Sequence, residues 1–323
     1  MVLGAVGAVL VWRLSGRGAE SAALESGMGS TTNHRHATKP AFQANSTGHG
    51  VKELIVCADD FAASERISRA IVCLAEQQRI SATSAMVLSP RWPQDALLLA
   101  TLRGRIDVGL HLDWTSGFAR RAGHGLSLGA AMMKSLVGGF RHAAAALVIE
   151  QQLDAFEAHW HAAPDHIDGH QHVHQFAGIR EALVEAMVRR YPGRQPWLRI
   201  SRVPTSQADA KSRIIAAMGA TALQQLADRS GITSSKALSG VYDFSGTQQH
   251  YARQMSGWLQ SSPAGATIMC HPSEMADRSN FPDPIAAARV SEFAYLSGPG
   301  FPAALTQGHV RLVRGAAIKG AAS

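Results

Sequence analysis

Residues 54–60 read LIVCADD, five apolar residues followed directly by two carboxylates. The apolar run has the length of a buried strand, and the helical pattern that follows it predicts a strand–helix unit. Ser64 is placed to cap that helix, whose buried face would carry Ile67, Ile71 and Leu74 at spacings of four and three. The carboxylates would then lie where the strand ends.

This alternation of strand and helix continues along the chain. Regular alternation implies parallel strands joined by right-handed crossovers, and about seven such units favour a closed barrel over an open sheet. We therefore predict an α/β fold, an irregular (β/α) barrel of the TIM type. Further strands are expected at 84–88, 106–112, 166–169, 197–201, 266–270 and 309–313, and helices from about Pro93, over 176–191, and near 209–228, 247–260 and 284–297.

One segment, 115–160, departs from this rhythm. It contains a Gly-rich stretch and then a long helical pattern with apolar residues on one side. An insertion after a barrel strand lies on the rim above the strand ends, so we predict a helical rim insertion there. The apolar side consists of Ile149, Leu153, Phe156 and Trp160.

Composition indicates a globular protein without a nucleic-acid footprint. The chain has 323 residues, of which 46% are hydrophobic and 17% charged. Much of the formal charge of +7 lies near the ends, and no basic run is interleaved with aromatic residues, so no nucleic-acid partner is expected. Cys57, Cys73 and Cys270 form no metal-type or disulfide pattern, which fits a reducing, cytoplasmic location.

The N-terminal segment, residues 1–50, is expected to be disordered. Its Gly, Ser, Thr and His content lacks apolar periodicity, and Met28 is an alternative start. The opening run MVLGAVGAVLVW is too short to span a bilayer comfortably, so no stable membrane span is predicted, although N-terminal anchoring or export is left open. The barrel is assigned to residues 51–315 and a tail to 316–323.

Polar residues stand at the carboxyl ends of four predicted strands. In a parallel barrel all these ends open on one face, so residues far apart in the sequence converge there. One strand-end histidine would be an ordinary structural residue, but four coincidences indicate a site. The residues are Asp59 and Asp60 after the first strand, His111, Asp168 with His170 in HIDGHQHVH (166–174), and His271.

Aspartate and histidine are ligands of borderline divalent metal ions, and three protein ligands with open positions are typical of a catalytic site. Such an ion acidifies a bound water molecule and polarises a carbonyl group. Two adjacent carboxylates could divide the labour, one binding metal and the other accepting a proton. Because adjacent strand residues point to opposite sides, both could reach one ion only if the chain turns there.

The motifs CADDF (57–61), VGLHL (108–112), HIDGHQHVH and MCHPSE (269–274) together resemble those of the YdjC-like (ChbG/HpnK) carbohydrate deacetylases. The resemblance runs from about residue 53 to 313. It implies an irregular (β/α) barrel that removes acetyl groups from N-acetylated sugars with a divalent metal ion, Mg in this family.

Carried over by motif, Asp60, His111 and His170 would bind the metal. By analogy with the wider polysaccharide deacetylases, Asp59 would be the catalytic base and His271 the acid. One departure is visible: the family usually has glycine after DDF, and this chain has Ala62. If that position takes a positive φ, alanine strains the turn.

The remaining polar residues are interpreted as supporting ones. We interpret Asp168 as orienting a ligand histidine, and Arg199 as pairing with Asp59, with a rim salt bridge as the alternative. His172 and His174 either line the substrate cleft or support it. His166 is expected to be packed or exposed, Arg289 and Glu292 to form a surface or interhelical pair, and Trp114 and Trp160 to lie in the core.

Three functions stay open at this point. The leading one is a metal-dependent hydrolase acting on a small-molecule N-acetylated sugar, either chito-oligosaccharide-like or a glycoside of hopanoid biosynthesis. The alternatives are a metal-dependent phosphoesterase and a non-catalytic sugar- or lipid-binding barrel. Zn is the alternative metal, since two imidazoles and one carboxylate suit it equally. A homo-oligomer is also left open.

Overall fold

The computed structural model describes residues 50–276 and 283–317. The segment expected to be disordered, apart from Gly50, and most of the expected tail therefore lie outside the described residues. The chain divides into two compact units, Met1–Gly50 and Val51–Ser323, and the following description concerns the second.

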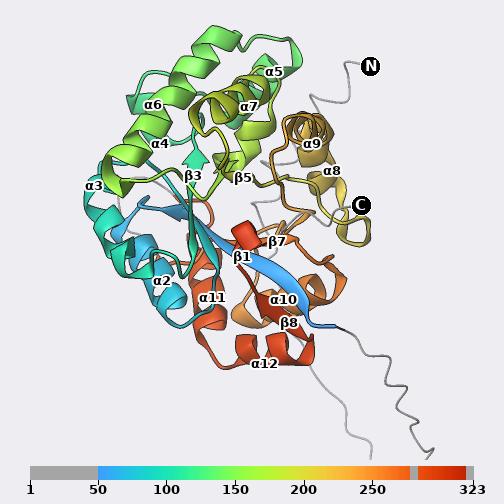
Figure 1. The fold of residues 1–323 in the computed structure, drawn as a ribbon. Coiled ribbons are helices and arrows are strands. Elements are labelled where there is room, and N and C mark those ends of the chain that lie inside the picture. Colours follow the sequence, from blue (N-terminus) through green and yellow to red (C-terminus); the bar gives the residue numbers. More distant parts are fainter. Residues whose placement is uncertain (1–49, 277–282, 318–323) are drawn as a thin grey trace, which may run out of the picture. The chain divides into compact units, whose positions relative to one another are not determined.

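A single curled sheet forms the centre of this unit (Figure 1). Every strand pairing is parallel, as the strand–helix alternation predicts. β8 (Val310–Leu312) pairs with the amino-terminal half of β1, beside the main path of the sheet. That path runs β5 (Trp197–Leu198), β4 (His166–Gly169), β3 (Asp107–Leu112), β2 (Ala82–Ala85), β1 (Lys52–Phe61), β7 (Thr267–Cys270) and β6 (Leu238–Ser239).

Isolated hydrogen bonds join the two ends of the path. The Leu198 N–H of β5 donates to the Thr233 carbonyl at 2.9 Å, and the Ser235 N–H donates back to Leu198 at 2.9 Å. Beyond them, the Leu238 N–H of β6 donates to the Arg202 carbonyl at 2.8 Å. The sheet thus closes without a regular ladder, and the predicted irregular TIM-like (β/α) architecture is confirmed.

Helices surround the sheet, and their buried faces follow the apolar spacing of the sequence (Figure 1). Ser64 caps α2 by accepting the Ile67 N–H, and Ile67, Ile71 and Leu74 are buried as predicted. No helix in the described residues is both long and apolar enough to cross a membrane. The helices are α2 (Glu65–Glu76), α3 (Trp92–Asp95), η1 (Ala96–Leu102), α4 (Gly117–Arg121), α5 (Leu128–Leu136), α6 (His142–Trp160), η2 (His170–Gln175), α7 (Ile179–Arg190), η3 (Thr205–Gln207), α8 (Ala210–Ala217), α9 (Ala220–Arg229), α10 (Gln248–Ser261), α11 (Ala286–Ser297), α12 (Gly300–Gln307) and η4 (Gly315–Ala317).

The rim insertion consists of three helices joined by short loops, α4, α5 and α6. Its long helix is α6, which buries the predicted apolar face and packs against α7. The stretch expected to be a Gly-rich loop holds α4 and α5, whose N-caps Ser116 and Ser127 bond to backbone N–H groups of the first turn. Trp114 and Trp160 are buried, so they belong to the core as expected.

The strand expected at 84–88 lies at Ala82–Ala85, and β6 was not expected. Two further differences have local reasons. The helix expected over 209–228 is broken at Gly219, which has a φ of +130° and lies against the Gln175 carbonyl. The strand expected over 197–201 is only two residues long, because the Ile200 N–H donates to the Ser235 hydroxyl rather than to a backbone carbonyl.

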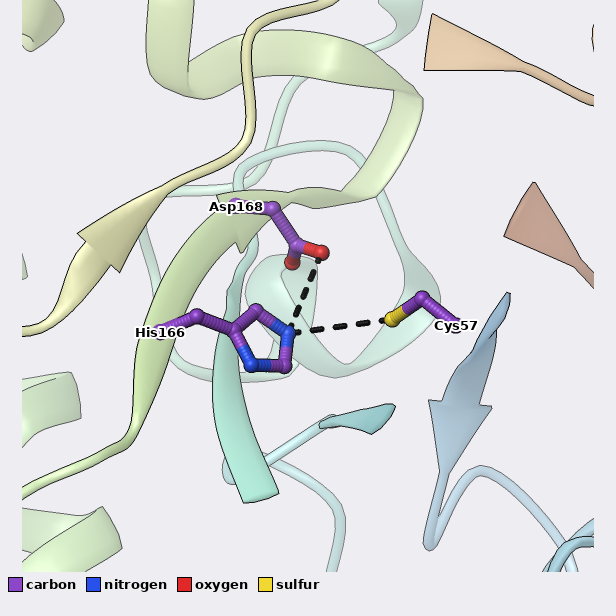
Figure 2. Close-up of side chains that lie close together, drawn as sticks. All are labelled: Cys57, His166 and Asp168. Atoms are coloured by element: carbon purple, nitrogen blue, oxygen red, sulfur yellow. Dashed lines mark hydrogen bonds and ion pairs between the residues drawn. The ribbon is translucent and has the colours of Figure 1, made fainter. Parts of the chain in front are cut away.

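Gly109 leaves room for a buried side chain inside the barrel. It lies on β3 opposite the buried ring of His166, which Figure 2 shows beside Cys57 and Asp168. A Cβ at Gly109 would lie 2.4 Å from atoms of that ring, far inside van der Waals contact. The His166 ring stacks on Trp197 at 4.5 Å between centroids and has no room to move aside on that face.

We therefore expect Gly109→Ala to lower the free energy of unfolding by about 1–3 kcal/mol, the usual cost of overpacking a core. The matched control is Gly257→Ala in α10, where a Cβ meets nothing within 4 Å. That change should stabilise the protein by about 1 kcal/mol, since alanine is the better helix former. Urea unfolding of both variants checks the pair, and equal effects would contradict the close approach at Gly109.

Candidate active site

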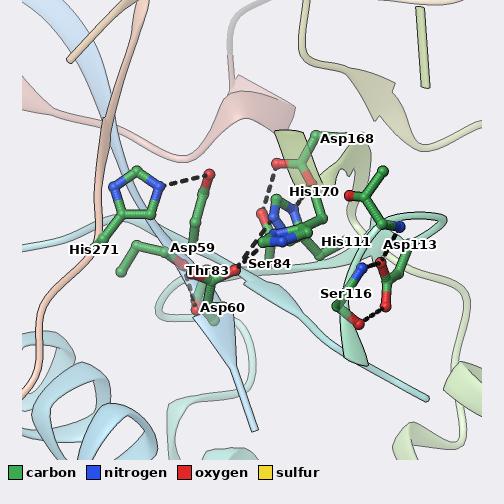
Figure 3. Close-up of polar contacts among 12 residues, drawn as sticks. Asp59, Asp60, Thr83, Ser84, His111, Asp113, Ser116, Asp168, His170 and His271 are labelled. Carbon is green, nitrogen blue, oxygen red and sulfur yellow. Dashed lines mark hydrogen bonds and ion pairs between the residues drawn. The ribbon is translucent and has the colours of Figure 1, made fainter. Parts of the chain in front are cut away.

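The polar strand-end residues meet at the carboxyl end of the barrel (Figure 3). Asp59 and Asp60 come from β1, His111 from β3 and Asp168 from β4. Two further histidines follow strands: His170 opens η2 directly after β4, and His271 comes directly after β7. Parallel pairing through β1, β2, β3 and β4 on one side and β7 on the other brings them together.

The end of β1 is irregular, and this directs both aspartates into the site. Asp60 has a φ of +68°, and the register between β1 and β2 shifts between Ala58 and Phe61. The chain therefore turns at the pair, which is the condition under which both side chains can face one site. Ala62 has a φ of +70°, so alanine occupies a left-handed position that glycine adopts without strain.

Three potential metal-ligand atoms converge beside this turn. The Asp60 Oδ1 lies 3.5 Å from the His111 Nε2 and 3.2 Å from the His170 Nδ1. The three atoms lie within 4.8 Å of one another. Among the described residues the buried Asp60 Oδ1 has no hydrogen-bond partner. Acceptor atoms gathered in this way fit a divalent cation, and the 23% exposure of the His170 side chain leaves that side accessible.

Asp168 orients the His111 ring. The His111 Nδ1–H donates to the Asp168 Oδ1 at 2.6 Å, which turns the Nε2 toward Asp60. Burial lowers the pKa of His111, but the carboxylates of Asp168, Asp59 and Asp60 outweigh it and raise the pKa to about 9. The surroundings of His111 thus favour positive charge, which either a second proton or a cation at Nε2 supplies.

Arg199 holds the other aspartate. Its guanidinium donates from Nη1 to the Asp59 Oδ1 at 2.6 Å and from Nη2 to the Asp59 Oδ2 at 2.8 Å. The same Nη1 lies 3.0 Å from the Asp168 Oδ2, and all three side chains are buried. Arg199 therefore fixes two carboxylates at once through charge-assisted hydrogen bonds.

His271 lies on the far side of Asp59. Its Nε2 is 3.8 Å from the Asp59 Oδ2, and its ring meets Phe244 edge-on at 5.2 Å between centroids. Burial lowers the pKa of His271 to about 4, so its imidazole is neutral at neutral pH in the metal-free protein.

The other histidines of HIDGHQHVH take separate positions. His166 is buried in the barrel interior, within 3.0 Å of the Ser84 Oγ. His174 is fully buried, and its Nε2–H donates to the Arg199 carbonyl at 2.8 Å, which places it behind Arg199. Burial lowers the pKa of His174 to about 4. His172 is half-buried and bonds through its Nδ1 to the Ser201 hydroxyl at 3.0 Å.

The interpretation of Arg289 and Glu292 as a surface or interhelical pair is wrong, because both are buried under the site. The Arg289 Nη2 donates to the Asp60 Oδ2 at 2.6 Å, and its Nε donates to Asp283 at 2.6 Å. Burial works to raise the pKa of Asp60, but the Arg289 guanidinium together with His170 and His111 outweighs it and holds that pKa well below its usual range.

A sequence signal for this pair does exist. On α11 the buried residues Ala288, Glu292 and Tyr295 recur at helical spacing, and Arg289 and Leu296 lie on the same face. Two charged residues thus fall on the apolar face of a helix, where an unpaired charge is too costly to bury. Such a placement indicates buried partners, here Asp60 and the strand end at His271.

Glu292 hydrogen-bonds to the backbone of His271, the candidate catalytic acid. Its Oε2 accepts the His271 backbone N–H at 2.5 Å, and its Oε1 accepts the Tyr242 hydroxyl at 2.7 Å. Burial raises the pKa of Glu292 to about 7, although both hydrogen bonds favour the ionised form.

Comparison with known proteins agrees with the residue pattern. A family model described as YdjC-like protein matches residues 53–307. A crystal structure from Enterococcus faecalis V583, of a candidate cellobiose-phosphate cleavage protein, aligns with a TM-score of 0.60 at 18% identity. The alignment covers 82% of this chain and 98% of that one, and it supports the fold alone.

A second solved structure, of a mutant CE4 family pseudoenzyme, aligns with a TM-score of 0.37 at 10% identity. That alignment covers 81% of this chain and 65% of the other, a similarity too low to support an inference. No curated protein sequence matches this chain.

The raised pKa of Glu292 generates a prediction about stability. The folded state holds this proton more tightly than the unfolded state, so wild-type stability should fall as the pH rises from about 4.5 to about 7. Glu292→Gln keeps an acceptor for His271 but cannot titrate. Relative to wild type, the variant should therefore gain stability by up to ~1.4 kcal/mol per pH unit across this window.

Urea unfolding of the metal-free proteins at several pH values measures the difference. Gln249→Glu, on the exposed surface of α10, is the control in which an added carboxylate should leave the slope nearly unchanged. An identical gap between wild type and Glu292→Gln at pH 5 and pH 7.5 would contradict the raised pKa.

Proposed function

The chain belongs to the YdjC-like protein family, and we propose that it is a metal-dependent hydrolase that removes the acetyl group from an N-acetylated sugar. The observation that carries this proposal is the convergence of the Asp60, His111 and His170 donor atoms next to Asp59 and His271. One set of residues can hold a cation while the other moves protons, which is the division that amide hydrolysis requires.

Asp60, His111 and His170 would hold the ion. When bound, a divalent ion supplies Lewis-acid polarisation of the acetyl carbonyl and makes water more acidic. The family resemblance favours Mg, whereas two imidazoles and one carboxylate also suit Zn. Arg289 keeps Asp60 ionised and aimed at this position through its 2.6 Å hydrogen bond.

Asp59 would act as the base. Its carboxylate accepts the proton of the attacking water as the water oxygen bonds to the acetyl carbon. The bidentate contact with Arg199 fixes the direction of the carboxylate, so little reorientation is needed before the proton moves.

His271 would act as the acid. The carbon–nitrogen bond breaks when the nitrogen receives a proton, which releases acetate and the free amine of the sugar. Since burial lowers the pKa of His271 to about 4, the ring is neutral at rest, so the proton that it donates must first reach it. Asp59, 3.8 Å away, is the nearby group that has just gained one.

A phosphoesterase is the less favoured alternative. Two-ion phosphoesterases need additional carboxylate ligands with free oxygen atoms. In this site both oxygens of Asp59 and both oxygens of Asp168 already take part in hydrogen bonds or ion pairs, whereas among the described residues the Asp60 Oδ1 has no hydrogen-bond partner and is left for one ion. A binding barrel without catalysis would not need an aspartate beside a histidine at the carboxyl end.

Acetate release tests the proposal. Purified protein is incubated with N-acetylated chito-oligosaccharides and with N-acetylated lipid-linked glycosides, after chelation and after addition of Mg or Zn. We expect release from at least one substrate class, loss on chelation, and recovery with one of the metals. Metal-dependent cleavage of a phosphate ester panel without acetate release would favour the phosphoesterase instead.

Variants of the ligand histidines should lose bound metal while remaining folded. We expect His111→Ala and His170→Ala each to abolish stoichiometric binding and activity, because each removes one of three ligands. His142→Ala is the control, since this histidine is about half exposed and pairs with Glu185 on the surface. Stoichiometric metal in either test variant, measured by atomic emission, would exclude that residue as a ligand.

Asparagine variants separate the roles of Asp59 and Asp60. Asp60→Asn should weaken metal binding. Asp59→Asn should retain the ion yet lower kcat by about 10²–10⁴-fold and remove the acidic limb of the pH–rate profile. Metal titration and steady-state kinetics distinguish the two, with melting temperatures to confirm folding. The opposite pattern would reverse the roles, and near-normal turnover in both would refute the hydrolase mechanism.

A further inference from the structure

Below the proposed metal ligands lies a fully buried polar cluster inside the barrel. It consists of Cys57 on β1, Ser84 on β2, and His166 and Asp168 on β4, three of which appear in Figure 2. The Ser84 Oγ is its centre, 2.6 Å from the Asp168 Oδ2, 3.0 Å from the His166 Nε2 and 3.3 Å from the Cys57 Sγ. Polar groups buried at this depth are costly unless they are hydrogen-bonded.

The contacts of the His166 ring fix the direction of these hydrogen bonds. Its Nδ1 has no hydrogen-bond partner among the described residues, whereas its Nε2 faces the Ser84 hydroxyl. A buried N–H without a partner is rarer than a buried acceptor without one, so the proton belongs on Nε2. Ser84 then accepts from His166 and is free to donate its own proton to Asp168.

The hydrogen bonds from His166 through Ser84 and Asp168 end at His111, a candidate metal ligand. The Asp168 Oδ2 accepts the Ser84 hydroxyl, and its Oδ1 accepts the His111 Nδ1–H at 2.6 Å. We infer that Ser84, supported by His166, is a positioning residue that sets the direction in which His111 presents its Nε2 to the cation. This inference rests on the proposed function, because it assigns the role through the metal site.

Asp168 needs this support because Arg199 contacts the same carboxylate and also influences its orientation. The Arg199 Nη1 lies 3.0 Å from the same Oδ2 that Ser84 contacts, and that guanidinium is shared with Asp59. Ser84 approaches the Oδ2 from β2 and holds the carboxylate plane so that the Oδ1 faces His111. A residue that hydrogen-bonds a ligand histidine directly, here Asp168, typically changes metal affinity by about 10–100-fold, so Ser84, one contact further away, should act at the lower end of this range.

The cluster could also be taken for a second metal site, since the Cys57, His166 and Asp168 donor atoms lie within 4.8 Å of one another. Two observations favour the hydrogen-bonded network. The Ser84 Oγ lies within hydrogen-bonding distance of all three donor atoms, so the cluster is satisfied without an ion. Both Asp168 oxygens are also already engaged, the Oδ2 by Ser84 and Arg199 and the Oδ1 by His111, whereas among the described residues the Asp60 Oδ1 has no hydrogen-bond partner.

Ser84→Ala tests the inference, with Ser239→Ala as the matched control. Ser239 is likewise fully buried on a strand, and its hydroxyl bonds to the Ser262 Oγ at 2.8 Å, without a contact to Asp168. We expect Ser84→Ala to weaken Mg or Zn binding by about 10-fold or more, by calorimetric titration, and Ser239→Ala to leave it unchanged. Ser84→Thr, which keeps the hydroxyl, should restore most of the affinity.

A proton NMR signal provides a readout that is independent of the metal. The short His111 Nδ1–H hydrogen bond should give a far-downfield resonance in the metal-free protein, assigned by its loss in His111→Ala. We expect Ser84→Ala to shift or broaden this resonance and Ser239→Ala to leave it in place. His166→Leu should act in the same direction as Ser84→Ala, and His166→Gln, which keeps an N–H donor, should act less.

An unchanged resonance and unchanged affinity in a folded Ser84→Ala protein would overturn the inference. Two ions per chain in wild type, with one lost in Cys57→Ala, would overturn it in favour of the second metal site. Failure of wild type to bind any metal would instead refute the proposed function, while the NMR comparison would still decide whether Ser84 positions His111.

Discussion

The arrangement of the site depends on the buried guanidinium of Arg199, which balances the negative charge of two aspartates. It comes from the end of β5 and reaches two carboxylates on other strands, Asp59 at 2.6 and 2.8 Å and Asp168 at 3.0 Å. Removing one partner from a buried ion pair typically costs about 3–5 kcal/mol, because the other charge stays desolvated. Arg199 therefore constrains the ends of β1, β4 and β5 to one arrangement.

A second arginine balances the remaining carboxylate. Arg289 reaches Asp60 from α11, so three buried aspartates face two guanidinium groups. The raised pKa of His111 follows from this remaining negative charge. A divalent cation placed at the His111 Nε2 would supply positive charge at the point where the site favours it, which is why the protein environment and the proposed metal are compatible.

This arrangement requires an unfavourable backbone conformation at the end of β1. Asp60 and Ala62 both lie in the left-handed region, and neither is glycine. Strain of this kind persists only where the surroundings hold the chain in place, and it is concentrated at functional sites. Here Asp59 is held by Arg199 and Asp60 by Arg289, so two ion pairs oppose the relaxation of one turn.

The sequence by itself determined the alternation of strands and helices, and with it the parallel curled sheet. Those features follow from apolar periodicity, which is local. It also indicated that Asp59, Asp60, His111, His170 and His271 would gather, because parallel strands bring their carboxyl ends to one face. The positions of Ser64 and of the apolar face of α6 were readable for the same reason.

Only the tertiary structure decided which buried charges meet. Arg289 and Glu292 looked like an ordinary helical pair, since spacing within α11 says nothing about the strand ends that the helix covers. The depth of His166 and its link to Ser84 depend on Gly109, which leaves room for the ring. Partners in a buried polar network lie up to 229 residues apart here, and their pairing is fixed by packing and desolvation, which no local pattern encodes.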